Sequence, residues 1–112
     1  MLRSKLSLLL LGLLLSPTFS TEARAQAVYG SIAGTVTDAQ GAVVPDATVV
    51  VTSVERNTSD TVQTNESGLY VKERLLPGKY KVTIEKAGFK KGEITEVDVN
   101  LDRQTEANLT LT

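Results

Sequence analysis

The 112-residue chain contains no histidine and no cysteine. Without histidine it lacks the commonest general base and the imidazole ligands of zinc sites, and without cysteine it lacks thiolate nucleophiles and disulfides. Tryptophan is also absent, and aromatic residues make up only 4% of the chain. The fold must therefore rest on aliphatic packing and backbone hydrogen bonds, and most nucleophilic and zinc-dependent chemistry is excluded.

Carboxylates are the acid–base groups that remain. Asp38, Asp46, Glu66 and Asp98 fall in predicted turns or at outward strand positions, where a carboxylate caps a turn or faces water. A calcium loop needs several acids close together, and the turns that hold Asp38 and Glu66 offer one acid each. We therefore expect a non-enzymatic protein with no catalytic residue, no metal and no cofactor.

Residues 1–25 have the pattern of a secretory signal peptide. Arg3 and Lys5 precede an apolar run over 6–15, and Ala23-Arg24-Ala25 supplies the small residues that a signal peptidase requires. The run is shorter than the ~20 residues of a membrane span, although an uncleaved N-terminal anchor is an alternative. We expect a signal-peptide helix over 1–25, a single domain over 26–112, no membrane span in the mature chain, and export to the periplasm, the outer membrane or the medium.

The charge of the predicted mature chain is small. Nine basic and twelve acidic residues follow position 25, which gives a net charge of −3. An interspersed, mildly acidic surface gives no reason to expect nucleic acid or an anionic membrane as a partner. The late lysines are interpreted as solvated outward faces of edge strands, where charge discourages pairing with other sheets.

Short Val/Ile/Tyr-rich runs alternate with Gly, Pro, Asp and Asn from residue 29 onwards, which is typical of half-buried strands. Gly34 within the first run indicates a close backbone approach. A phase slip between Ile94 and Val97 indicates a β-bulge. Seven strands are predicted, over residues 29–37, 47–54, 59–64, 69–75, 80–85, 93–101 and 104–111.

Seven short strands at this spacing predict an all-β fold, an antiparallel Greek-key sandwich rather than a barrel. The apolar residues at alternating positions predict the core. It comprises Ile32, Val36, Ala47, Val49, Val51, Val62, Tyr70, Leu75, Tyr80, Val82, Ile84, Phe89, Val97, Val99 and Leu109.

Several ordered motifs carry a family resemblance. They are Gly34-Thr35-Val36-Thr37-Asp38 with the following Val44-Pro45, then Glu66-Ser67-Gly68-Leu69-Tyr70, Leu75-Leu76-Pro77-Gly78-Lys79-Tyr80, and Ala87-Gly88-Phe89. Together they resemble the carboxypeptidase regulatory-like domain. The resemblance implies a transthyretin-like (prealbumin-like) sandwich, classed with carbohydrate-binding-like folds and related to the Cna B-type repeats.

The sequence departs from the family pattern at two points. The family usually has an aromatic or apolar residue at the position of Lys72, so an inward-facing lysine there must extend its ammonium to the rim. Some Cna B-type domains form a Lys–Asn cross-link, but residues 28–37 contain no lysine to pair with Asn108. We therefore expect no such cross-link.

A leader followed directly by this module resembles the N-terminal extension of Oar-like TonB-dependent receptors. In those proteins a plug and a barrel follow, whereas this sequence stops at Thr112. A free-standing module and a truncated receptor both agree with that. The module itself is an accessory found on many proteins, so the resemblance specifies the fold better than the function.

Two functions stay open. The first is a structural or protein-interaction role in the bacterial envelope, by strand addition or loop contact. The alternative is carbohydrate binding, which usually needs an exposed aromatic ring. Tyr70, Tyr80 and Phe89 are assigned to the core, which leaves Tyr29 as the candidate glycan contact. The expected partner is accordingly an envelope protein or a glycan.

Overall fold

The computed structural model describes residues 28–112. The predicted signal peptide over 1–25 and the two residues after it lie outside the described residues. Within 28–112 the secondary structure consists of strands, and no helix there has the length and apolarity of a membrane span. The strands are β1 (Gly30–Thr37), β2 (Thr48–Ser53), β3 (Ser59–Gln63), β4 (Leu69–Leu75), β5 (Gly78–Glu85), β6 (Gly92–Val99), β7 (Gln104–Glu106) and β8 (Leu109–Thr110).

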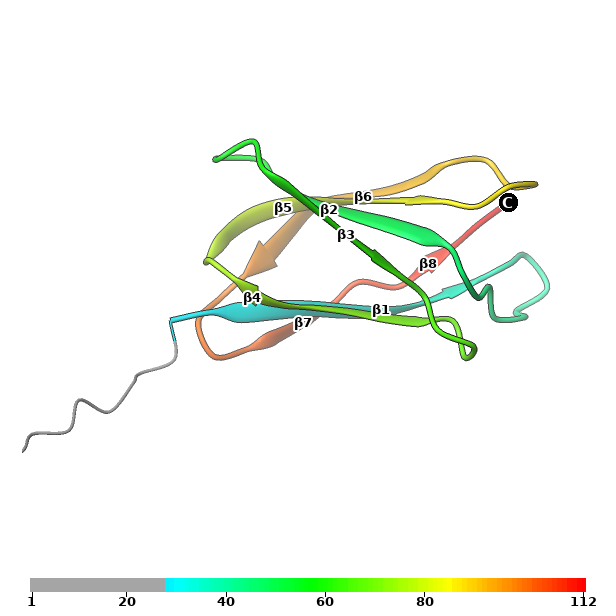
Figure 1. Ribbon diagram of the computed structural model, residues 1–112, viewed down its shortest axis with the longest axis horizontal. Helices are drawn as coiled ribbons and strands as arrows, with labels where there is room; N and C mark the ends of the chain where they lie inside the picture. Colours follow the sequence, from blue (N-terminus) through cyan, green and yellow to red (C-terminus); the bar gives the residue numbers. More distant parts are fainter. Residues whose placement is uncertain (1–27) are drawn as a thin grey trace, which may run out of the picture.

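The strands form two sheets that pack face to face (Figure 1). One sheet has the order β4-β1-β7, with β8 also paired to β1, and the other has the order β3-β2-β5-β6. The chain passes between the sheets after β1, β3, β4 and β6, which is why strands close in sequence lie in different layers. The all-β sandwich predicted from the sequence is confirmed.

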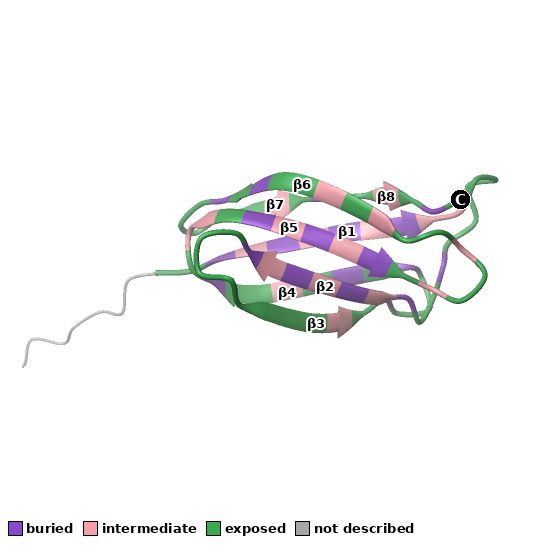
Figure 2. Ribbon diagram, turned by 90° about the horizontal axis from the view of Figure 1, so that it is seen from above, coloured by how far each residue is buried: buried purple, intermediate pink, exposed green. Residues whose placement is uncertain are grey.

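Alternation of buried and exposed residues explains why these strands pack as two layers. Every second residue of β1, β2 and β5 is buried, as the coloured stripes of Figure 2 show. Ile32, Val49, Val82 and Ile84 have no exposed surface, and burying each such side chain contributes about 1.5–3 kcal/mol. The core is therefore aliphatic, with the two tyrosines Tyr70 and Tyr80 at its margins.

The predicted core is largely confirmed. All of its residues are buried except Val62, Phe89 and Leu109, which are partly buried and pack against it. The prediction missed Val44, Ala107 and Leu111, which are buried. Leu111 lies within the last predicted strand, 104–111, but was not counted as core.

The last predicted strand, 104–111, is wrong in two respects. It is divided into β7 and β8, which makes eight strands instead of seven, and both pair parallel to β1, so the sandwich is not antiparallel throughout. The parallel direction follows from the turn after β6, which carries the chain into the other sheet beside β1. The division occurs because two side chains interrupt the pairing with β1. The Tyr70 hydroxyl donates to the Ala107 carbonyl at 2.5 Å. The Thr35 N–H donates to the Asn108 side-chain Oδ1 at 2.8 Å instead of to a backbone carbonyl.

The bulge predicted in β6 is confirmed. The pairing between β5 and β6 shifts between Tyr80–Val97 and Val82–Ile94, and Glu96 at this point has a φ of 57°. The strand predicted over 93–101 extends too far, because Leu101 lies beyond the end of β6 and is 52% exposed. β6 ends at Val99 and the chain turns towards the other sheet, where the Asp102 N–H donates to the Tyr29 carbonyl.

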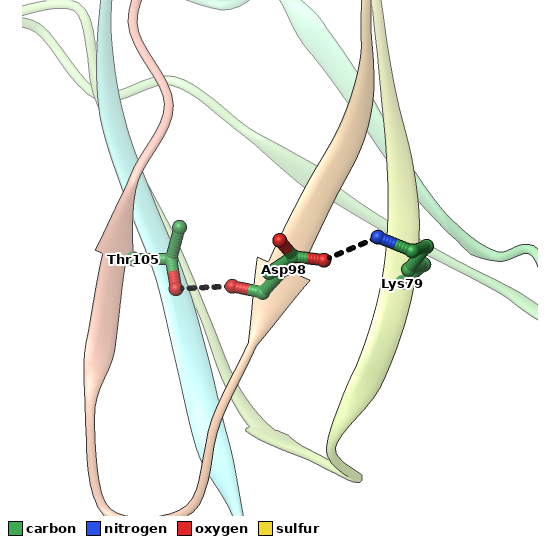
Figure 3. A network of polar contacts seen from close by, with 3 residues as sticks. All are labelled: Lys79, Asp98 and Thr105. Atoms are coloured by element: carbon green, nitrogen blue, oxygen red, sulfur yellow. Dashed lines mark hydrogen bonds and ion pairs between the residues drawn. The ribbon is translucent and has the colours of Figure 1, made fainter.

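The two long sides of the sandwich differ. On the side of β6 and β7, the Thr105 hydroxyl donates to the Asp98 carbonyl at 2.7 Å and so links the two sheets (Figure 3). Further along, the Lys90 N–H donates to the Thr112 carbonyl at 2.8 Å. On the other side, β3 and β4 are edge strands of different sheets and share no ladder. The β6 and β7 edges share no ladder either, but the β3–β4 side, which lacks a hydrogen bond between its two edge strands within residues 28–112, is called the open side.

Candidate functional site

The two outer faces of the sandwich have different chemistry. The outer face of the β3-β2-β5-β6 sheet carries three exposed ion pairs, all the ion pairs found among residues 28–112. They are Lys79–Asp98 at 2.9 Å (Figure 3), Lys81–Glu93 at 3.6 Å and Lys91–Glu85 at 3.7 Å. Such exposed pairs contribute little stability but keep the face well hydrated. A partner that bound this face would gain little by displacing the water from it.

The outer face of the other sheet is hollowed along β1. Its outward residues there are small (Ser31, Ala33, Thr35 and Thr37) and are flanked by longer side chains of β4 and β7. The pairing sets Ala33 between Val71 and Glu106, so a short side chain lies between two longer ones. The resulting hollow of about 430 Å³ is called the β1 trough and is lined mainly by Ala33, Thr35, Leu69, Val71, Gln104 and Glu106.

The β4 wall of the trough is apolar and exposed. Leu69 and Val71 point outward from β4 and are 44% and 45% exposed. They lie directly opposite Thr35 and Ala33 of β1 in the antiparallel pairing. Covering two such aliphatic side chains would contribute roughly 1 kcal/mol or more each, since each is already about half buried. The trough thus combines an apolar wall with amide and carboxylate groups on the opposite side.

The free edge of β4 runs beside this wall. The Val36 N–H of β1 donates to the Gly68 carbonyl, just before β4. Because hydrogen-bonded pairs alternate along an antiparallel ladder, the backbone groups of the even-numbered residues of β4 bond β1, and those of the odd-numbered residues point away from the sheet. The outward backbone groups of Leu69 are already hydrogen-bonded to Asn65. The Asn65 N–H donates to the Leu69 carbonyl, and the Asn65 Oδ1 accepts from the Leu69 N–H. Val71 and Glu73 are left with outward-facing backbone groups at the edge.

Tyr29, the candidate glycan contact, is exposed at the start of β1. The residue is 40% exposed, and the Arg74 guanidinium carbon lies 5.9 Å from the ring centroid, a cation–π distance. Arg74 reaches this place because β4 has one extra residue opposite β1 here and Arg74 adopts a φ of 60°. Tyr29 and Arg74 border a second hollow, of about 330 Å³, at the end of the β1 trough.

The other tyrosines are structural. Tyr70 and Tyr80 are buried, and their hydroxyls donate to the backbone carbonyls of Ala107 and Leu76. Burial raises the pKa of Tyr70 to about 12. The sequence predicted that both rings belong to the core, but it gave no signal for the hydroxyl of Tyr70 as the group that holds β7 and β8 in place.

Stability should fall at alkaline pH through Tyr70. Because its folded pKa lies above the usual 10, the folded state is favoured below pH 10, and this contribution is lost as the pH rises from 10 towards 12. We expect the denaturant midpoint to fall more steeply over that interval in the wild type than in Tyr70→Phe. If the denaturant midpoint fell equally steeply with pH in the two proteins, Tyr70 would not be the group responsible. Tyr80→Phe, which removes the hydroxyl of the other buried tyrosine, serves as the matched comparison.

The predicted turn-capping role of Asp38 is confirmed. Its Oδ1 accepts from the N–H groups of Gln40 and Ala42, each at 2.9 Å. Asp98 is ion-paired with Lys79 on the outer face, and Glu66 is exposed in the turn before β4. Across residues 28–112 the structure has no group of three or more acidic, histidine or cysteine side chains that could hold a metal ion. The acids therefore stay dispersed, without a common centre.

The family model of the carboxypeptidase regulatory-like domain matches residues 31–112. The chain belongs to this family. The match covers the whole described sandwich from the second residue of β1 to the last residue, so the resemblance in the sequence motifs is confirmed. No protein with a curated description matches the chain.

Several solved structures share the fold. The Bacillus anthracis TIE protein is 20% identical with a TM-score of 0.61, over 75% of this chain and 16% of that one. A proposed carbohydrate-binding protein of Bacteroides uniformis is 20% identical with a TM-score of 0.59, over 72% and 40%. Another, PA1324 of Pseudomonas aeruginosa, is 17% identical with a TM-score of 0.55, over 79% and 92%.

These likenesses establish the fold alone, because every identity is low. The domain spans less than half of the first two proteins. Dioxygenases also share the sandwich, at 16% identity or less. One architecture therefore serves both binding proteins and enzymes, and function has to be argued from the side chains of this chain.

Proposed function

We propose that this carboxypeptidase regulatory-like domain is an exported, non-catalytic interaction module of the bacterial envelope. Its partner is an extended segment of another envelope protein, bound in the β1 trough and along the edge of β4. The observation that carries the proposal is the contrast between the outer faces. One carries three ion pairs at β5 and β6, while the other has an apolar wall of Leu69 and Val71 beside a hollow.

An extended segment fits this site for two reasons. The outward backbone groups of Val71 and Glu73 can pair with an added strand, which supplies affinity through main-chain hydrogen bonds. The trough beside them can accept alternate side chains of such a strand, because small residues line its floor and Gln104 and Glu106 line its far wall. Affinity would come from the edge and specificity from the trough.

The exported location is part of the proposal and depends on the signal-peptide pattern of residues 1–25. The resemblance to the N-terminal extension of TonB-dependent receptors is consistent with a periplasmic site of action, outer-membrane association or secretion. The absence of cysteine means that the core needs no oxidising compartment to fold.

Carbohydrate binding is the second candidate. It is supported by the exposed Tyr29 ring beside a hollow with arginine, carboxylate and amide groups, and by two similar structures of proposed carbohydrate-binding proteins. Against it, Arg74 lies over the ring of Tyr29, and the other two tyrosines are buried. A flat aromatic platform is thus smaller here than sugar stacking usually requires.

A crosslinking experiment tests the protein-interaction proposal. A photoreactive residue at position 71, in cells that make the full chain, should capture an envelope protein that the same residue at position 50 does not capture. Val50 is the matched control because it is an outward valine on β2, in the ion-paired face. A peptide from the captured segment should bind about tenfold more weakly to Val71→Arg, while Val50→Arg should bind as the wild type does.

Equal capture at the two positions would overturn the proposal. A glycan array with the same purified protein tests the alternative, since saturable sugar binding that is lost in Tyr29→Ala and kept in Val71→Arg would assign the site to carbohydrate. Retained sugar binding in Tyr29→Ala would contradict Tyr29 as the contact.

A further inference from the structure

We propose that Lys72 prevents two copies of this chain from pairing through their β4 edges. This inference goes beyond the proposed function, since it concerns copies of the chain and holds whatever the partner is. It begins from the open edge of β4 and from an inward-facing charge in the middle of that edge.

The open part of the edge permits one favourable self-pairing. Val71 and Glu73 are the residues with outward backbone groups, because Asn65 occupies those of Leu69 and the chain bulges at Arg74. When two β4 edges pair antiparallel, the outward backbone groups of Val71 and Glu73 in both copies are all hydrogen-bonded in one register only. In that register Val71 of one copy pairs with Glu73 of the other. The two-fold axis then passes through residue 72.

In this register the two Lys72 residues face each other. They would form a non-hydrogen-bonded pair with Cα atoms about 4.5 Å apart, and their side chains would point to the same side. Like charges directly opposite one another destabilise a sheet pair. Lys72 therefore acts against the one register that satisfies the whole open edge.

The inward direction of Lys72 increases this cost. It lies opposite Ile32, which is completely buried, so its side chain starts on the inner face of the sheet and is half-buried at the open side of the sandwich. Joining two edges there would take both ammonium groups further from water, which is unfavourable for unpaired charges. Inward-pointing charges on edge strands are a recognised means of avoiding edge-to-edge association.

The neighbouring edge strand has the same feature with the opposite sign. Asp60 of β3 lies opposite Val51, which is buried, so it also occupies an inward position on an exposed edge strand. The open side of the sandwich thus has one inward-facing charge on each edge. A strand from a different protein with a small or acidic residue opposite Lys72 would meet no such repulsion, so the charge selects against self-association specifically.

Sedimentation equilibrium of the purified protein, made from the full chain, tests the proposal. Wild type should remain monomeric. Lys72→Val should dimerise, with a dimer dissociation constant at least about tenfold lower than that of the wild type. An equal mixture of wild type and Lys72→Glu should form heterodimers more strongly than either protein alone, because opposite charges would then face each other. A fold defect alone could not produce that mixed association.

Two controls assign the contact to the β4 edge. Lys81→Val makes the same change on β5, which has partners on both sides, and should stay monomeric. The double variant Val71→Pro/Lys72→Val removes an outward N–H from the edge and should return to monomer. A monomeric Lys72→Val, a dimeric wild type, or a double variant that still dimerises would each overturn the proposal.

Discussion

Replacing Val82 with aspartate is expected to unfold the domain. Val82 has no exposed surface and lies on β5, paired with Val51 of β2 on one side and Ile94 of β6 on the other. An unpaired carboxylate at this position costs about 4 kcal/mol or more, which is most of the total stability of a small domain. Circular dichroism should show no cooperative thermal transition in this variant.

Thr83→Asp is the matched control for that result. Thr83 follows Val82 on β5 and is outward-facing and half-buried, so the same carboxylate is placed next to water. We expect a cooperative melt, lowered only by the cost of a carboxylate directly opposite Glu93. A cooperative, wild-type-like transition in Val82→Asp would mean that the inward assignment of β5 is wrong.

The second large effect is expected at Gly34, which should tolerate no side chain. A Cβ atom there would overlap the Ala107 carbonyl and approach the ring of Tyr70, because β1 lies against the end of β7 at this point. Gly34→Ala should destabilise the domain by about 3 kcal/mol, since backbone atoms must move to make room. Denaturant unfolding monitored by fluorescence or circular dichroism measures the change.

Gly41→Ala separates this steric effect from backbone strain. Gly41 has a φ of 87°, so alanine is conformationally unfavourable there, but a Cβ would meet no atom within 4 Å. We expect a loss of about 1 kcal/mol at Gly41. If Gly34→Ala cost no more than Gly41→Ala, the close approach of β1 and β7 would not be a determinant of stability.

Residues whose surroundings follow from local alternation were predictable from the sequence. β4 has the predicted bounds, and the inward residues of β1, β2 and β5 are those that the period-two pattern indicated. The bulge in β6 was predictable because it shifts the phase of apolar residues along the strand itself. Gly34 was also recognisable, since a glycine within a strand indicates a close contact.

Features that depend on distant partners were not predictable. The break between β7 and β8 depends on Tyr70 and Asn108, which bond groups 37 and 73 residues away in the chain. The β1 trough depends on which strands flank β1, and the sequence alone did not specify that β7 would lie parallel beside it. Tyr29 was identified from its type and position, but the guanidinium over its ring results from a bulge in β4.

The parallel pairing of β1 with β7 and β8 also determines how the domain would carry tension. Tyr29 precedes one end of β1, and β8 pairs with the residues at the other end, where Leu111 donates to the Thr37 carbonyl. The two ends of residues 28–112 thus leave at opposite ends of the long axis (Figure 1). A pull between them would load the β1 ladder along the strands, in shear, so its hydrogen bonds would resist together instead of opening one after another.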